Sequence, residues 1–337
     1  MRTFLAIAAM AFLAIGFTAC QGKVDESVSE LCDRQCLEGF MDQYLAAMVA
    51  QDKSMSPFSE SFRHTENAKE MPVAEASEGL WANPVSLGDY KFYIADPEAG
   101  QIAYVGLVNE NEKPALLSMR IKVEKGQITE AEAIVVREMR ENNLWTLKTP
   151  PAEFTRALPS EEQLPREELA RFADYYFDSI EQIDGSIVPW HDECYRLENG
   201  MWTAGQKLPD EIAANMPEMP PPKKKRPTGS EGSIAFGRGA CTEAIDSGVF
   251  ALIESIRPRH TPVVDVERGV TWGVYMFNHP GVETVTMPDG TTQPAAYFAG
   301  QPNSMPMSEL FKIKEGKVRD IMAIGVINEY MSGSGWE

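Results

Sequence analysis

The chain has 337 residues, of which 50 are acidic and 31 are lysine or arginine, so its formal net charge at pH 7 is −19. A charge of this sign and size argues against nucleic acid and anionic lipid surfaces as partners. The basic block at residues 223–226 lies among prolines and glycines, where a solvated loop is a simpler interpretation than a nucleic-acid patch.

The first 19 residues combine one positive charge, at Arg2, with an apolar run, and a polar chain follows them. This pattern predicts a secretory signal peptide rather than a membrane-spanning helix. The letters FTAC at its end resemble a bacterial lipobox, which predicts lipid attachment to Cys20. The alternative is an ordinary signal peptide that is cleaved after Ala19. Either interpretation predicts export to the periplasm or the cell surface, and lipidation predicts an outer-membrane anchor with residues 20–30 as a tether.

The next region, residues 31–141, begins with a segment that recurs later in the chain. Residues 37–67 align with residues 169–199 without a gap, and nine of the 31 positions are identical where chance gives roughly two. The identical pairs are Leu37/Leu169, Phe40/Phe172, Asp42/Asp174, Tyr44/Tyr176, Asp52/Asp184, Ser54/Ser186, Pro57/Pro189, Glu66/Glu198 and Asn67/Asn199. We interpret this as an internal duplication, which predicts two domains of one fold.

Each copy begins with apolar residues at three- and four-residue spacing, the pattern of an amphipathic helix. In the second copy Pro189 forbids continuation of the helix, and a short turn is predicted to carry Trp190, His191 and Asp192. Strands are predicted at residues 90–94, 102–109, 115–123 and 128–136, and again at 262–266, 269–277, 307–313 and 318–326.

The remaining segments connect or interrupt the two copies. Residues 142–165 contain four prolines and are predicted to be a linker. The second domain is predicted to span residues 166–337, with a proline- and lysine-rich insertion at residues 207–239.

Several blocks of sequence together resemble one family. They are CDRQCLEGFMDQYL and RIKVEKGQITEAEAIV in the first copy, and IEQIDGSIVPWHDECYRLENG, IRPRH, VVDVERG, ELFKIKEGKVRDIMAI and SGW in the second. In this order they resemble the DUF8021 family over nearly the whole chain after the signal peptide. The resemblance implies an α+β protein of two tandem NTF2-like (SnoaL-like) domains, each with helices packed on a curved antiparallel sheet and a pocket between them. It implies little about chemistry, because that fold class includes cyclases, isomerases, dehydratases, lyases and non-enzymatic binders.

Four cysteines remain if Cys20 carries a lipid, and an even number in an exported chain indicates disulfides, with three possible pairings. Cys194 and Cys241 flank the insertion and are predicted to pair, which leaves Cys32 and Cys36 to each other. A zinc site is the weaker alternative, since the cysteines are not arranged in close pairs. With scattered histidines and no nucleotide-binding motif, we expect neither a metal nor a cofactor.

Polar residues that point into an apolar pocket are the candidates for a functional site. We predict that His191 and Asp192 transfer protons and that Arg196 and Arg257 stabilise a developing negative charge. The predicted substrate-binding residues are Tyr176, Trp190, Glu198, Asn199 and His279. The first copy has a serine and a glutamate in place of the His191–Asp192 pair, so one working pocket is expected, in the second copy.

Each candidate also has a structural alternative. Asp192 can cap a short helix, and Arg196 can be a structural partner of Glu198 or Asp192. Glu198 and Asn199 occur in both copies and can simply shape the following turn. His279 precedes a Pro-Gly pair and can lie on an exposed turn, and the helical tyrosines can belong to the core.

Two functions remain open from the sequence. The first is a cofactor-independent lyase, isomerase or dehydratase that abstracts a proton from a small apolar compound bearing a carbonyl or hydroxyl group. The second is a non-catalytic module that binds a hydrophobic ligand or a partner domain.

Overall fold

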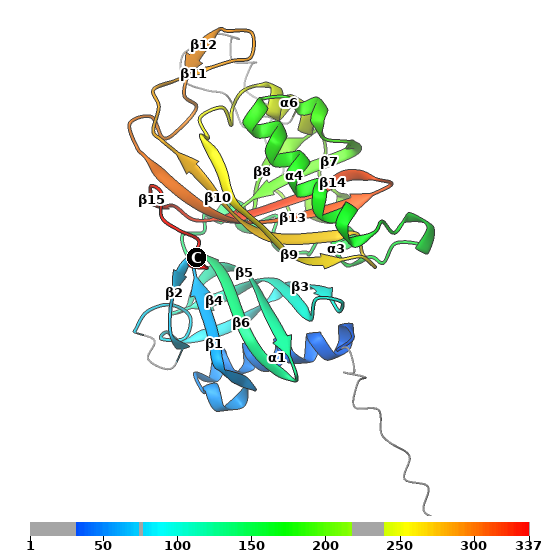
Figure 1. The fold of residues 1–337 in the computed structure, drawn as a ribbon, viewed down its shortest axis with the longest axis vertical. Coiled ribbons are helices and arrows are strands. Elements are labelled where there is room, and N and C mark those ends of the chain that lie inside the picture. The colour runs from blue at the N-terminus through cyan, green and yellow to red at the C-terminus, as the bar shows by residue number, and fades with distance from the viewer. Residues whose placement is uncertain (1–31, 74–76, 218–238, 337) are drawn as a thin grey trace, which may run out of the picture. The chain divides into compact units, whose positions relative to one another are not determined.

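The computed structural model describes residues 32–73, 77–217 and 239–336 (Figure 1). The predicted signal peptide, Cys20, the tether and most of the predicted insertion lie outside the described residues. Among those that are described, no helix is both long enough and apolar enough to cross a membrane.

Two long helices begin the two halves of the described chain. Helix α1 (Arg34–Ala50) and helix α4 (Arg166–Gln182) each have 17 residues and start at equivalent positions of the duplication. Each ends at a residue in the left-handed conformation, with φ of 53° at Gln51 and 54° at Ile183. A 3₁₀ turn follows each helix, at Lys53–Met55 (η1) and Gly185–Ile187 (η4), and both turns are capped by an aspartate. The two copies of the repeated segment therefore form the same sequence of elements.

The two sheets have the same topology. The first contains β1 (Phe58–Glu66), β2 (Lys69–Glu70), β3 (Val85–Asp96), β4 (Gln101–Glu110), β5 (Lys113–Glu124) and β6 (Gln127–Val136), in the order β2-β1-β6-β5-β4-β3. The second contains β7 (Trp190–Glu198), β8 (Met201–Gly205), β9 (Ser255–Asp265), β10 (Val270–His279), β13 (Asn303–Lys314) and β14 (Lys317–Gly325), in the order β8-β7-β14-β13-β10-β9, and β15 (Asn328–Glu329) pairs with β13. We call α1 to β6 the first half and α4 to β15 the second half.

Two details differ from the sequence prediction. Each sheet contains one parallel pair, β1 with β6 and β7 with β14, so the sheets are mainly rather than wholly antiparallel. Trp190, His191 and Asp192 begin strand β7 and do not form a turn. These residues form a strand because the backbone of β7 pairs with that of β14. Pairing between segments so far apart in the chain cannot be predicted from the local sequence.

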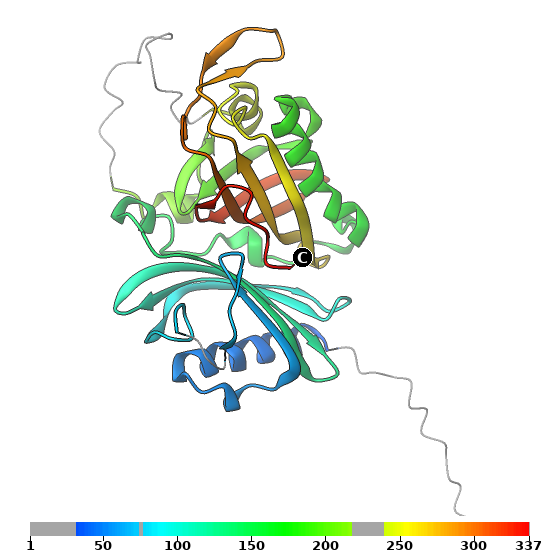
Figure 2. The ribbon, with the colours of Figure 1, turned by 60° about the vertical axis from the view of Figure 1, so that its left-hand side comes forward.

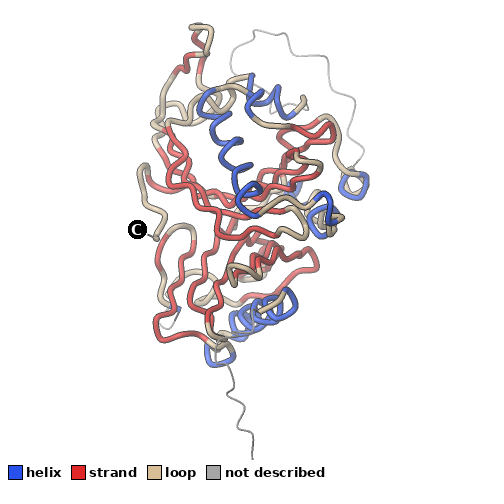
Figure 3. Tube along the Cα trace, turned by 45° about the vertical axis from the view of Figure 1, so that its right-hand side comes forward, coloured by secondary structure: helices blue, strands red, loops and turns tan. Residues whose placement is uncertain are grey.

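Each sheet curves around its own helix, as Figures 2 and 3 show. Helix α1 packs against the first sheet in one apolar core, and α4 packs against the second in another. The opposite faces of the sheets share a third core, in which Val105 and Leu116 of the first half meet Trp272 and Leu310 of the second. Each half therefore has an α+β architecture, with a helix on one face of a curved sheet.

The connecting segments contain short helices and a 3₁₀ turn of their own. Helices α2 (Glu141–Leu144) and α3 (Ala152–Thr155) and the 3₁₀ turn η3 (Ser160–Glu162) lie in the predicted linker, where Leu147 and Phe154 are buried in the core between the sheets. Helices α5 (Asp210–Ala213) and α6 (Cys241–Asp246) flank the part of the insertion outside the described residues. The linker is therefore part of the packing.

Reciprocal ion pairs join the halves. Arg34 at the start of α1 pairs with Asp265 at the end of β9, with 2.7 Å between nitrogen and oxygen. Arg166 at the start of α4 pairs with Asp96 at the end of β3, at 2.5 Å. Each long helix thus begins with an arginine that pairs with an aspartate of the other half. The two arginines occupy equivalent positions, and so do the two aspartates.

Both predicted disulfides are present. Cys194 on β7 is bonded to Cys241 on α6, with 6.1 Å between their Cα atoms. Cys32 is bonded to Cys36 at the start of α1. Two disulfides in one chain are typical of an oxidising compartment, as expected for an exported protein.

Candidate functional site

The candidate site is a cavity of about 210 Å³ in the second half. Strands β7, β8, β10 and β13 supply one side, and the segments around Phe250 and Phe298 supply the other. Its apolar and aromatic lining consists of Met201, Phe250, Ile253, Phe277, Tyr297, Phe298, Met305 and Met307. Three of its lining residues are charged or titratable near neutrality: Arg196, Glu198 and His279. The cavity is therefore apolar with one polar end.

Arg196 is the centre of that polar end and is only 3% exposed. Its Nη1 donates to Glu198 Oε2 at 2.6 Å and to Thr203 Oγ1 at 3.1 Å, and its Nη2 donates to Glu309 Oε1 at 3.2 Å. Phe250 lies against the guanidinium, with 5.6 Å between Cζ and the ring centroid. Nε has no hydrogen-bond partner among the described residues, so one donor of this buried cation is unused.

Glu309 lies behind Arg196 on β13 and is fully buried. Burial raises the pKa of its carboxyl group to about 7, against the opposing attraction of Arg196. Within the described chain, its Oε2 and the hydroxyl of the buried Tyr176 make no hydrogen bond of normal geometry, although Arg196 lies close enough to lower the pKa of that hydroxyl. Burial raises the pKa of Tyr176, which keeps its hydroxyl protonated. This layer thus places a carboxyl group with a pKa near neutrality and a protonated tyrosine hydroxyl next to the Arg196 charge.

His279 is the last residue of β10 and is 2% exposed. Burial lowers its pKa to about 4, while the Asn303 side chain and the charge of Glu198 oppose the change. Its imidazole is therefore neutral at pH 7. Neither its Nδ1 nor Asn303 Oδ1 makes a hydrogen bond of normal geometry with a described residue, although the Asn303 side chain lies close enough to the ring to raise its pKa.

The cavity can thus recognise an oxygen atom on an apolar molecule. Arg196 Nε–H is a donor, Asn303 Oδ1 is an acceptor, and the neutral imidazole of His279 offers either role according to its tautomer. Buried polar atoms without partners are uncommon in folded proteins, and a bound polar group would supply the hydrogen bonds that these atoms lack.

The structure brings together four of the residues that the sequence singled out: Tyr176, Arg196, Glu198 and His279. The sequence reasoning missed Glu309 and Asn303. The sequence does contain an indication of Glu309. It lies on the same side of its strand as Met307 and Phe311, so it is a charged residue at a core-facing position. Asn303 has no comparable signal, since it begins the strand.

The predicted proton-transfer pair lies elsewhere. His191 is half-buried and Asp192 exposed at the start of β7, where both line a surface depression beside the Cys194–Cys241 disulfide. The His191 ring accepts the backbone N–H of Glu193 at 3.1 Å. The structure therefore does not place this pair at the polar end of the cavity, because β7 carries Arg196 and Glu198 there from its other end.

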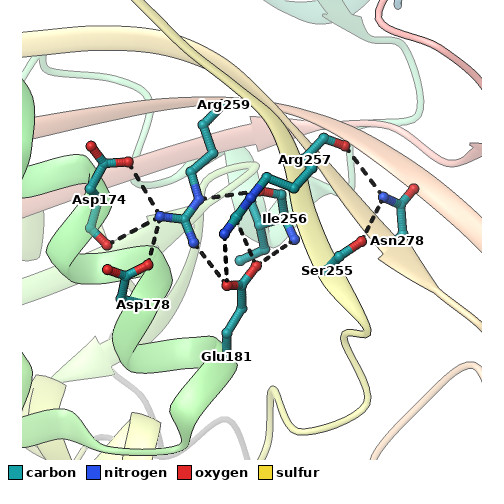
Figure 4. Close-up of polar contacts among 8 residues, drawn as sticks. All are labelled: Asp174, Asp178, Glu181, Ser255, Ile256, Arg257, Arg259 and Asn278. Carbon is teal, nitrogen blue, oxygen red and sulfur yellow. Dashed lines mark hydrogen bonds and ion pairs between the residues drawn. The ribbon is translucent and has the colours of Figure 1, made fainter.

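Arg257 is not among the residues that line the cavity, and Figure 4 shows the polar network to which it belongs. Its side chain is 55% exposed and pairs with Glu181 of α4 at 2.9 Å. Its neighbour Arg259 bridges Asp178 and the same Glu181, at 2.7 and 3.0 Å. Arg257 is thus part of a surface network that holds β9 on α4, and we withdraw it as an anion-stabilising candidate.

Two further candidates have structural roles. Trp190 donates its indole N–H to Gly185 O at 2.7 Å and packs edge-on against Tyr176. Asn199 adopts a φ of 48° and exchanges two hydrogen bonds with the backbone of Gly325. Asn67 bonds the backbone of Val135 in the same way in the first half. The turn-shaping alternative for Asn199 therefore holds.

The first half fills the corresponding space with its own side chains. Trp81 packs edge-on against Tyr44, the equivalent of Tyr176, and donates its indole N–H to the Tyr44 hydroxyl at 2.9 Å. Glu66, the equivalent of Glu198, accepts from the backbone of Leu80 and from Arg137. An internal tryptophan thus satisfies in the first half the tyrosine hydroxyl that lacks a partner among the described residues of the second.

Comparison with known proteins gives two similarities. Residues 162–325 match the family model described as "Domain of unknown function (DUF8021)". A solved NTF2-like protein of unknown function from Cytophaga hutchinsonii is similar at 13% identity, over 29% of this chain and 88% of that chain, with a TM-score of 0.24. No curated protein matches. The residues that match this family model include the whole lining of the cavity.

Proposed function

We propose that the second half binds a small, neutral, largely apolar molecule that carries a hydroxyl or carbonyl oxygen. The observation that supports this is the polar end of the cavity, where Arg196 Nε and His279 Nδ1 are buried without partners among the described residues. A ligand oxygen that accepts from Arg196 and, as a hydroxyl, donates to His279 would satisfy both.

The size and charge of the cavity limit the ligand. Its volume of about 210 Å³ lies below the roughly 300–1,000 Å³ of pockets for drug-sized ligands, so a compound of one or two rings fits. The Arg196 charge is already paired with Glu198. A carboxylate ligand would compete with that ion pair, which favours neutral ligands over anions.

Binding can be tested with purified protein and a probe panel of phenol, 2-naphthol, acetophenone, indole and benzoate. We expect calorimetric binding of the neutral oxygen compounds and weaker binding of benzoate. His279→Leu should weaken binding at least about tenfold, which corresponds to one lost hydrogen bond of about 1.4 kcal/mol. His191→Ala is the matched control and should bind as the wild type does. Absence of binding at millimolar probe, or an equal effect of both substitutions, would reject the proposal.

Proton-transfer catalysis is the second candidate, and the position of the Glu198 carboxylate beside the Arg196 guanidinium in the lining of an apolar cavity favours it. In this reaction Glu198 takes a proton from the carbon next to a ligand carbonyl. The C–H electron pair forms the carbon–carbon double bond, and Arg196 stabilises the resulting oxyanion.

The catalytic candidate has a direct assay. The protein should exchange the α-hydrogens of a bound aryl ketone with deuterium from ²H₂O, followed by NMR. Glu198→Gln should lower the exchange rate by about a hundredfold or more, the scale of losing a general base. If exchange equals the buffer rate while the ketone binds, the half is a binding module without this activity.

Export and lipid attachment at Cys20 are also part of the proposal, supported by the two disulfides and the lipobox-like FTAC. Cells that express the chain should incorporate labelled palmitate into it, and Cys20→Ser should abolish the label. Equal labelling of both proteins would remove Cys20 as the attachment site.

A further inference from the structure

Equivalent hairpins in the two halves are joined by very different connections. Strand β4 pairs with β5 from Val105–Ser118 to Glu110–Lys113, and residues 111–112 close the hairpin. Strand β10 pairs with β13 from Val274–Ser308 to His279–Asn303 in the same register, but residues 280–302 join them. The second half therefore contains an insertion that begins directly after His279.

The insertion leaves the sheet after β10 and returns to it at β13. We call the place where its two ends meet the neck. There the backbone N–H of Gly300 donates to Gly281 O at 2.9 Å. Both glycines have positive φ, 76° at Gly281 and 67° at Gly300, which suits a sharp reversal at each side of the neck. Beyond it, β11 (Thr284–Thr286) pairs with β12 (Thr292–Pro294) in a small separate hairpin, seen in orange in Figure 1.

On its return toward β13 the insertion carries two aromatic residues to the cavity. Tyr297 and Phe298 both line it, with 4.9 Å between their ring centroids. The His279 ring lies 5.0 Å from the Phe298 ring and 6.3 Å from the Tyr297 ring. Phe298 has a φ of 58°, an uncommon conformation for a bulky residue, so the surrounding packing imposes its direction.

In the first half, the equivalent hairpin of β4 and β5 has no insertion. Glu110, the equivalent of His279, pairs there with Arg137 and accepts a hydrogen bond from Asn83 at 2.9 Å. An ion pair occupies the place that aromatic rings cover in the second half. The apolar cover at the polar end therefore depends on the insertion and not on the shared fold.

We infer that residues 280–302 form a selectivity wall, in which Tyr297 and Phe298 determine which oxygen-bearing compounds enter the cavity and shield the His279 end from water. This inference rests on the proposed binding function. The lining contains the aromatic rings of Phe250 and Phe277 as well as Phe298, which favours flat aromatic ligands over aliphatic ones of equal size.

The test exchanges the connections. In the graft variant the Asn-Glu turn of residues 111–112 replaces residues 280–302, and the matching hairpin register predicts a folded product. We expect 2-naphthol to bind at least tenfold more weakly than to the wild type, and the preference for phenol over cyclohexanol to disappear. Val282→Ala, a half-exposed site in the same insertion, is the control and should retain the wild-type values.

A second readout does not depend on a ligand. Loss of the cover should expose His279, so that its NMR titration moves from about 4 toward its ordinary 6.5 in the graft variant. If the graft does not fold, the Tyr297→Ala, Phe298→Ala double variant should show the same changes in binding and titration.

The possible failures are distinguishable. If the wild type binds no probe, the binding function fails. If the wild type binds and the altered proteins keep its affinity and its preference for aromatic rings, the selectivity wall is wrong while the binding function stands.

Discussion

The hydroxyl oxygens of Ser118 and Ser308 lie 2.7 Å apart in the core between the two sheets. The two serines occupy equivalent positions, because each is the strand partner of the equivalent Val105 and Val274. Ser118 also accepts the indole N–H of Trp272 at 2.8 Å. A residue and its own duplicate thus form a buried hydrogen bond where the halves meet.

The first prediction concerns this pair. Ser118→Ala should lower the free energy of unfolding by about 1–3 kcal/mol, because it leaves both Trp272 and Ser308 unpaired in a buried place. Ser308→Ala should lower the free energy of unfolding by less, since Trp272 keeps Ser118 as its acceptor. The double variant should cost less than the sum of the two, because their common bond is lost only once. Urea denaturation of the three variants measures this, and strict additivity would contradict it.

The second prediction is a pH dependence at Glu309. Burial raises its folded pKa to about 7, above its ordinary 4.5, so its favourable contribution is present below pH 4.5 and is lost as the pH rises through 7. Glu309→Gln stays neutral at every pH. Between pH 5 and pH 8 the unfolding free energy of Glu309→Gln should gain on that of the wild type by on the order of 2 kcal/mol. Exposed Glu329→Gln should show no such trend, and a flat difference for Glu309→Gln would refute the assignment.

The third prediction compares the disulfides. The Cys194–Cys241 bond spans a sequence separation of 47, and the Cys32–Cys36 bond one of 4. In the chain-entropy model, replacing the first pair by alanine should cost about 4 kcal/mol and replacing the second about 2 kcal/mol. Thermal unfolding of the two double variants tests the order, and a larger loss from the short loop would oppose it.

The fourth prediction concerns Trp81 in the first half. Trp81→Gly should cost about 3–5 kcal/mol, because it leaves an apolar cavity and removes the partner of the Tyr44 hydroxyl. Added indole should refill this space and raise the melting temperature of the variant more than that of the wild type. The rescue should weaken in Trp81→Gly, Tyr44→Phe, which lacks the acceptor oxygen. No rescue by indole would mean that the space collapses when Trp81 is removed.

The sequence alone was sufficient for the repeated parts of this protein. Helices α1 and α4 follow from local apolar spacing, and their equivalence follows from identities such as Tyr44/Tyr176. The Cys194–Cys241 disulfide followed from an even cysteine count and from the position of the two residues around one insertion. These features depend on residue type and spacing along the chain, which a sequence displays directly.

Only the tertiary structure decided which polar residues meet. Arg196 and His279 come from distant strands, and the pairing of β7 with β14 and of β10 with β13 brings them to one cavity. His191 looked equivalent to Arg196 as a candidate, yet it lies near the opposite end of the same strand. Trp81, in the connection between β2 and β3, likewise packs on Tyr44 and fills the corresponding space of the first half. Such outcomes depend on strand register and on the path of long connections, and these are set by packing between segments that are far apart in the sequence.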